Sequence, residues 1–399
     1  MNKNFSKLLS QFFTLAAAVF VFFFVSRNCV SLKKTLLAQQ NGWVSCTGKI
    51  ISVEDTKVVY YEDENTNLKQ TLILFRVLLT GGKNRNKEVL ALQTIDDFVA
   101  IKAKQVEAGD RVIVLNTGAP EDVTDFEQII RNPAYFFEEY NRIPYLVVLF
   151  FIFAFLIILF GGGKGIKTLI SLLLTCIVIF FYFIPSVFSG VSLYKSSLFV
   201  CLYSLITTIL IISGYTKKSF IAIAGCSGGL LCAALLTVIM TKCLKLNGFL
   251  NNESVYLLSI LPKGSSNLVS VIFASITIGS IGAIMDVSMS LASALNELAV
   301  TVPDISFKQL LKSGFEIGKD MMGTMANTLI LAYIGGSLSF VLVLVAYNTS
   351  YLGLLNHQMI TVEILQGLAG SIGILCTIPF TTILAAVIYS VKFSVSIEK

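Results

Sequence analysis

Two groups of polar residues in the C-terminal half of the sequence have the types and spacing needed to bind an ion or a small polar solute. The first lies where an apolar run ends, in the segment GSIGAIMDVSMSLASALNEL at residues 279–298, which contains the carboxylate of Asp286. Residues three or four apart share one face of a helix, and at this spacing stand Ser275, Gly279, Gly282, Asp286, Ser290 and Ser293. A charged carboxylate inside a bilayer costs at least ~2.5 kcal/mol, so such a residue needs a compensating partner or a function.

The second group lies in SGFEIGKDMMGTMANTLILAY, residues 313–333. Helical spacing places Glu316, Asp320, Thr324 and Asn327 on one face, with Gly323 beside Thr324. The two apolar runs concerned are neighbours in the chain, so their helices are predicted to be antiparallel and joined on one side. We therefore expect Asp286, Asp320, Thr324 and Asn327 to converge at a similar depth.

Two interpretations of these stripes stay open. Small and polar residues allow close helix packing and interhelical hydrogen bonds, which are structural roles, and Lys319 has the spacing to pair with Glu316 or Asp320. The same residues also have the chemistry of a binding site for an ion or a small solute.

Other kinds of chemistry find little support in the sequence. The eight Cys residues form no CxxC pair and the single His lies far from them, so neither a metal site nor a cofactor is expected. No nucleophile–base pair or nucleotide-binding fingerprint is evident, since GGGKG at 161–165 lacks the Walker pattern. We expect a protein that is not an enzyme and does not bind nucleic acid. A disulfide between Cys29 and Cys46 remains an open alternative.

The composition indicates an integral membrane protein. Hydrophobic residues make up 55% of the 399 residues and charged residues only 14%. An apolar run covers about 11–26, and seven more have about the ~20 residues needed to cross a bilayer. These seven are 143–161, 168–188, 193–213, 219–241, 266–285, 323–346 and 364–391. The fold class is therefore an α-helical polytopic membrane protein with about eight transmembrane helices.

The distribution of Lys and Arg predicts the orientation of these helices. Most Lys residues of the short loops fall on the side of the N-terminus, which the positive-inside rule assigns to the cytoplasm. Both termini are then cytoplasmic, as is a helical loop at 286–322 within the membrane domain of residues 143–399. No small-x-small cleavage site follows the first run, so residues 1–27 are expected to be an uncleaved signal anchor.

Residues 28–142 differ from the rest of the chain. About half of the charges fall here, and short alternating runs such as VSCTGKIISVE, KVVYYE, QTLILFRVLLTGG, EVLALQ and DRVIVL are separated by turn signals. Five or six short strands at this spacing predict a small all-β module, a barrel of OB-like size. Its position between the first two spans predicts that it is extracytoplasmic.

The sequence resembles the YibE/F family of bacterial multispanning membrane proteins. The resemblance rests on GSIGAIMDVSMSLASALNEL, on SGFEIGKDMMGTMANTLILAYIGGSL and on GSIGILCTIPFTTILAA, and it extends to AGDRVIV and AGCSGG. It implies an integral protein of the bacterial cell envelope, and it supplies neither a substrate nor catalytic residues.

These observations lead to one expected function and one alternative. We expect a permease or channel of the cell membrane for a small solute or ion, with the stripes around Asp286 and Asp320 as its binding residues. The alternative is an envelope scaffold or signalling component that binds a partner through its β-module. The expected partners are the lipid bilayer, an unidentified solute or ion, and a second copy of the chain or another envelope protein.

Overall fold

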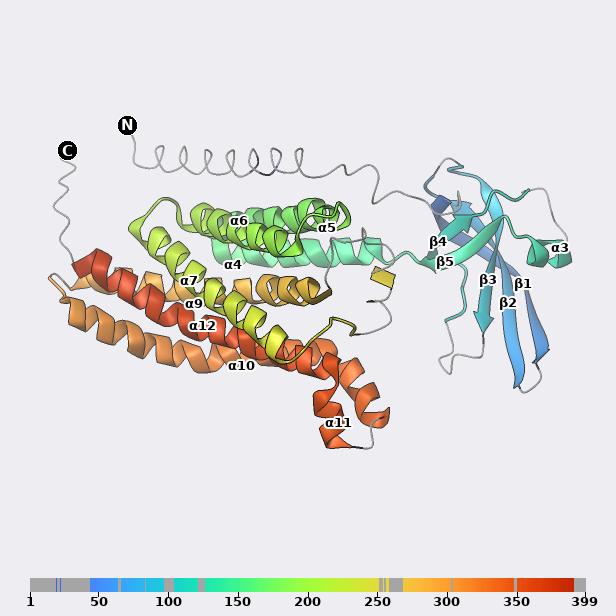
Figure 1. Ribbon diagram of the computed structural model, residues 1–399. Coiled ribbons are helices and arrows are strands. Elements are labelled where there is room, and N and C mark those ends of the chain that lie inside the picture. Colours follow the sequence, from blue (N-terminus) through green and yellow to red (C-terminus); the bar gives the residue numbers. More distant parts are fainter. Residues whose placement is uncertain are drawn as a thin grey trace. The chain divides into compact units, whose positions relative to one another are not determined.

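The computed structural model describes residues 44–63, 66–82, 84–96, 104–120, 126–250, 268–302, 304–347 and 350–390, with isolated residues before 44 and between 250 and 268. The chain forms two compact units, one of residues Leu37–Leu156 and one of Met1–Leu36 with Ile157–Lys399 (Figure 1). Each unit is described by itself.

The first unit contains a β-barrel, as the alternating runs predict. Its strands close in the order β1-β2-β3-β5-β4. A short helix, α3, precedes the last strand. The elements are β1 (Val44–Asp63), β2 (Thr66–Leu79), β3 (Glu88–Asp96), β4 (Arg111–Asn116), α3 (Phe126–Arg131) and β5 (Tyr135–Tyr140).

Alternating apolar side chains fill the barrel. Phe75, Val77, Val112 and Val114 are fully buried because every second residue of a strand points inward. Tyr135 is only 1% exposed, and its hydroxyl accepts hydrogen bonds from the side-chain amides of Asn84 at 3.0 Å and Asn116 at 2.9 Å. The polar end of a large buried ring is thereby satisfied, and β5 is fixed to the rest of the barrel.

The β1–β2 hairpin extends beyond the barrel. Its pairing continues from Gly48↔Leu79 to Asp63↔Thr66, whereas β3 stops pairing with β2 at Gln70↔Asp96. Two register shifts in β1 near Ser52 and Asp55 let one long strand bend from the barrel into the hairpin. Beyond Gln70 the described hairpin is two-stranded and exposes Tyr60, and Val58 is exposed opposite Thr71, where β3 still pairs with β2.

The second unit is helical. Six helices among the described residues are long and apolar enough to cross a membrane: Ile143–Phe188, Leu193–Ser213, Lys217–Cys243, Leu268–Thr301, Phe307–Tyr347 and Gln358–Ser390. The first of them comprises α4 (Ile143–Val178), η2 (Ile179–Phe183) and α5 (Ile184–Phe188), and the others are α6, α7, α9, α10 and α12 in chain order. The predicted first span, 11–26, lies almost wholly outside the described residues. One described residue in it, Phe22, packs against the cluster of Val178, Tyr182, Val200 and Tyr203.

The helix α4 is broken at Gly162. This residue has φ 52° and ψ −131°, which is not a helical conformation. A Cβ atom on Gly165 would collide with the carbonyl oxygen of Ile157. In an unbroken helix, residues eight positions apart are separated by about 12 Å along the axis. The chain therefore bends sharply here, between the predicted runs 143–161 and 168–188.

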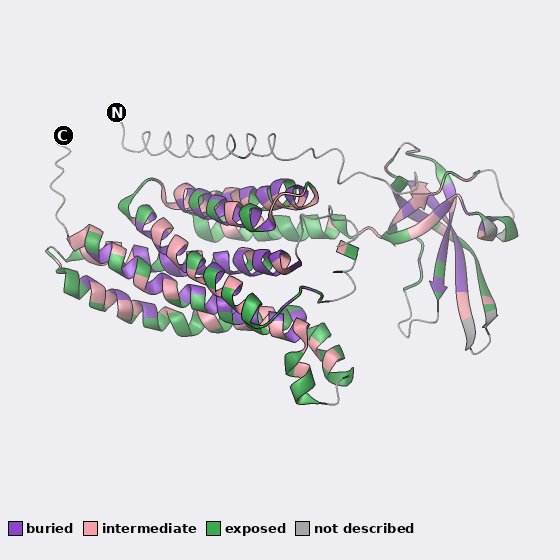
Figure 2. Cartoon of the chain, in the orientation of Figure 1, coloured by how far each residue is buried: buried purple, intermediate pink, exposed green. Residues whose placement is uncertain are grey.

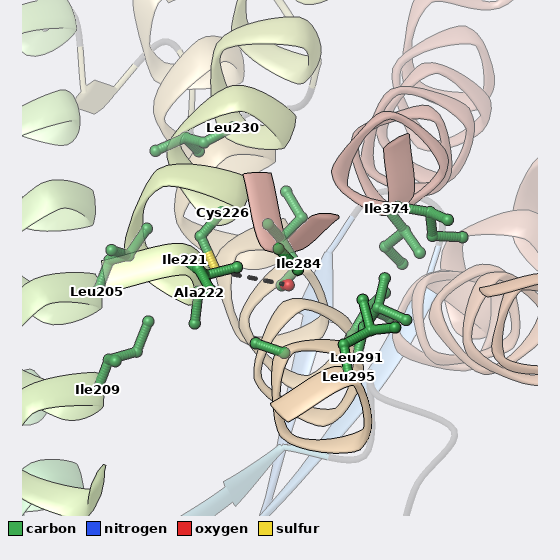
Figure 3. Close-up of a cluster of buried hydrophobic side chains, with 14 of the residues drawn as sticks. Leu205, Ile209, Ile221, Ala222, Cys226, Leu230, Ile284, Leu291, Leu295 and Ile374 are labelled. Atoms are coloured by element: carbon green, nitrogen blue, oxygen red, sulfur yellow. Dashed lines mark hydrogen bonds between the residues drawn. The ribbon is translucent and has the colours of Figure 1, made fainter. Parts of the chain in front are cut away.

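The core of the helical unit is built around α9 (Leu268–Thr301). In Figure 2 this helix is largely buried, whereas α10 (Phe307–Tyr347) is largely exposed. Ile284, Leu291 and Leu295 of α9 are fully buried in a cluster with side chains of α6, α7 and α12 (Figure 3). The thiol of Cys226 on α7 lies 3.7 Å from the Ile284 carbonyl oxygen. Because its neighbours cover most of α9, only a narrow side of this helix remains uncovered.

The limits of the barrel predict which fragment folds alone. Residues 37–142, expressed without the membrane helices, should give a β-type circular dichroism spectrum and a cooperative melt, since all five strands are present. Residues 37–132 lack β5 and with it the buried ring of Tyr135. Loss of a large buried ring costs about 3–5 kcal/mol. We expect no cooperative melt from the shorter fragment, and equal melts for both fragments would contradict the assignment of β5 to the barrel.

Candidate functional site

The polar stripe of α9 occupies the side of the helix that its neighbours leave uncovered. Ile276, Ile284, Val287 and Leu291 are fully buried on one side of α9. The exposed positions on the other side include Ser275, Gly279, Gly282, Asp286 and Ser290. Both sets recur at steps of three or four residues, but their positions along the sequence are offset from each other. They therefore lie on different sides of the helix. Asp286 therefore points away from the apolar core.

The second stripe lies on α10, a helix of 41 residues. Its start has a capping box: the Ser306 hydroxyl accepts from the Gln309 backbone N–H at 3.3 Å, and the Gln309 side-chain oxygen accepts from the Ser306 N–H at 3.0 Å. The helix then continues unbroken into the predicted membrane span, so the later part of the predicted helical loop at 286–322 belongs to α10 itself. Glu316, Asp320, Gly323, Thr324 and Asn327 all lie on its exposed surface.

The contacts of these polar side chains differ. Lys319 pairs with Glu316 at 2.9 Å, and both side chains are more than half exposed. The Thr324 hydroxyl donates to the Met321 carbonyl oxygen at 3.1 Å. Across the described part of the chain, the side chains of Asp286, Asp320 and Asn327 make no hydrogen bond or ion pair. Of the two pairings open to Lys319, the structure contains the one with Glu316.

The packing of α9 on α10 sets the depth of the two stripes. A Cβ atom on Gly279 would lie 2.5 Å from the Tyr333 hydroxyl, and one on Gly314 would lie 3.1 Å from Leu295. The helices are thus antiparallel, and interpolation between these contacts places Asp286 at about the level of Thr324. The two stripes therefore reach the same depth, although no hydrogen bond joins them among the described residues.

A separate set of small residues packs α7, α9 and α12 together. The Ser288 hydroxyl lies 3.0 Å from the Ala222 carbonyl oxygen and 2.8 Å from the Thr381 hydroxyl. Cβ atoms on Gly225 and Gly229 would collide with the hydroxyls of Thr381 and Thr377. The glycines of AGCSGG and the threonines that flank Pro379 are thus explained by close packing. They lie on faces other than the Asp286 stripe.

A comparison with models of protein families shows to which family the chain is related. The model described as YibE/F-like protein matches residues 149–391, which is more than half of the sequence. The chain belongs to this family. The match extends over the helical region and leaves out the β-barrel, and with the apolar helices it identifies a membrane protein. No curated protein and no solved structure gives a match.

This YibE/F-like chain holds a further carboxylate that the sequence analysis did not single out. Glu363 is the only acidic residue of α12 (Gln358–Ser390), and it lies near Tyr333 and Ser337 of α10 around one cavity. The apolar run predicted at 364–391 begins one residue too late to include it, whereas the helix begins at Gln358. A lone carboxylate at the edge of an apolar run was the available signal.

The glycines of this YibE/F-like chain allow a matched test of packing against surface positions. Gly229→Ala and Gly225→Ala should each destabilise the protein, since overpacking costs about 1–3 kcal/mol. Gly282→Ala is the control, because nothing lies within 4 Å of its added Cβ atom. Melting temperatures in detergent should fall for the first two variants and stay unchanged for the third. A drop of equal size in all three would contradict the assignment of Gly225 and Gly229 to close helix contacts and of Gly282 to an open position.

Proposed function

We propose that this protein is a permease or channel for a small cation or polar solute in the cell membrane, and not an enzyme. The observation that carries the proposal is Asp286: an exposed carboxylate, without a described partner, in a helix long and apolar enough to cross a bilayer. Asp320 and Asn327 supply further oxygen ligands on the neighbouring helix.

The energetics favour a polar path beside Asp286. If its carboxylate faced lipid, it would carry the full cost of a charge in hydrocarbon. A structural ion pair with Lys319 would remove that cost, but Lys319 is paired with Glu316 at 2.9 Å. Water or a polar solute along the uncovered side of α9 removes the cost instead. Two unpaired carboxylates give such a path a negative potential, which attracts cations.

The small residues of the stripe support the same proposal. A path for a solute needs space next to its polar groups. Gly282 removes side-chain volume one turn from Asp286, and the position of a Cβ on it is empty to 4 Å, whereas Gly279, two turns away, makes room for the Tyr333 hydroxyl. A larger apolar residue at position 282 would fill that space.

A second candidate function rests on the β1–β2 hairpin. Its two-stranded end exposes Tyr60, 67% accessible, and Val58, 41% accessible, is exposed on the same strand next to this end. Exposed strands with apolar side chains are suited to pairing with another protein. In this alternative the chain is an envelope scaffold or signalling component, and Asp286 has no role in its activity.

The substitution Asp286→Asn separates the two proposals. Asn has nearly the same shape, so helix packing is kept and only the charge is lost. We expect cation uptake by proteoliposomes to fall at least tenfold while the melting temperature remains unchanged. Glu297→Gln is the matched control, since Glu297 is an exposed carboxylate on the same helix. Full uptake with Asn at position 286 would rule out the hypothesis of a charged binding site and favour the scaffold function.

The proposed topology has eight spans, with both termini cytoplasmic and residues 28–142 outside. The break at Gly162 supports two spans within residues 143–188, and residues 11–26 supply the first. Reporter fusions at Lys87 and after Lys399 should then give signals from opposite sides of the membrane. Identical signals would rule out this arrangement.

A further inference from the structure

A cavity of about 380 Å³ lies between α10, α12 and the short helix α11 (Tyr351–Asn356). Its walls are almost entirely apolar and include Ile330, Ile334, Leu354 and Leu368. This volume falls in the range of small-molecule sites, which are ~300–1,000 Å³ and mostly apolar with a few polar groups. The cavity lies within the helical unit, at a distance from Asp286: Tyr333 in its wall is nine positions from Thr324, or about 13 Å along α10.

Glu363 is the one carboxylate in the wall of this cavity. It is partly buried on α12, the Ser337 side chain of α10 lies within its reach, and it forms no ion pair with any residue that the structure describes. The Tyr333 hydroxyl, also in the wall, is buried without a hydrogen-bond partner. The third polar side chain, Ser337, has its hydroxyl donating to the Tyr333 carbonyl oxygen at 2.9 Å. Among the residues that the structure describes, the wall therefore offers a carboxylate without a cationic partner, inside an apolar space.

We infer that this cavity binds a lipophilic cation, an ammonium group carried on a hydrocarbon body. The charge of Glu363 selects the ammonium group, since opposite charges attract strongly where water is scarce. The apolar walls take the hydrocarbon by burial of its surface. A neutral chain of the same length satisfies only the walls, and an anionic chain meets the Glu363 charge with repulsion. The inference does not depend on transport through the Asp286 stripe.

A larger side chain at position 367 would fill the cavity without straining the backbone. It lines the cavity, and its added Cβ would make only an ordinary contact, at 3.7 Å from Ile330. Gly367→Leu should therefore fill the space with its side chain, whereas Glu363→Gln keeps the shape and removes the charge.

The test uses the full chain in nanodiscs of zwitterionic lipid, with empty nanodiscs subtracted. The probe is radiolabelled decyltrimethylammonium in equilibrium dialysis, with decanol and decyl sulfate as neutral and anionic competitors of the same chain length. We expect saturable binding at one site per chain, poor competition by decanol and decyl sulfate, about tenfold weaker binding by Glu363→Gln, and loss of the site in Gly367→Leu. Glu297→Gln is the control and should bind like the unmodified chain.

Each variant is first checked for an unchanged melting temperature, and Glu363→Gln alone decides the question if Gly367→Leu does not fold. Absence of saturable binding would overturn the proposal. Competition by decanol equal to that of unlabelled decyltrimethylammonium, or unchanged affinity in Glu363→Gln, would do the same, because the cavity would then be an apolar crevice without selection for charge.

Discussion

The structure depends on a single constraint: the backbone N–H groups of a membrane helix are already hydrogen-bonded within the helix. A side chain that donates can still bond a carbonyl oxygen of its own helix, whereas a side chain that only accepts finds no free donor there. Hydroxyl groups donate in this way. Thr237, Thr277 and Thr377 donate to carbonyl oxygens four residues earlier at 2.7–2.8 Å. A carboxylate only accepts hydrogen bonds, so a donor group of another element, a cation or water must reach it. Asp286 and Glu363 are two carboxylates in this position, and both proposed sites follow from it.

The same helices keep packing and polarity on separate faces. Ser288 of α9 lies against α7 and α12, where its hydroxyl reaches Ala222 and Thr381. Asp286, two positions earlier, points away from these neighbours and is exposed. Glycines have different roles on the two faces: Gly225 and Gly229 let helices approach closely, and Gly282 leaves a position beside Asp286 empty. A rigid core thus holds an uncovered polar side in place.

Much of the fold follows from sequence patterns, and the rest does not for identifiable reasons. Alternation predicts the barrel, and the predicted run 193–213 coincides with α6. VSCTGKIISVE and KVVYYE read as two strands because register shifts near Ser52 and Asp55 have no clear sequence signal. Helical spacing shows that Asp286 and Gly282 share a face, but only the packing of neighbouring helices decides that this face is uncovered. Glu363 was missed because a span boundary read from hydropathy excludes a carboxylate at the edge of the helix.

The central claim is that water or solute reaches the uncovered side of α9 within the membrane. The most direct measurement is the reactivity of single cysteines with a charged, water-soluble thiol reagent, in a background without the native cysteines. Gly282→Cys is on the stripe, and Ile372→Cys is an exposed apolar position at matched depth on α12, since a Cβ atom on Gly370 would lie 3.3 Å from the Cβ of Ser280. The account predicts that the cysteine at 282 reacts at least tenfold faster than the one at 372. Equally slow reaction at both positions would contradict it.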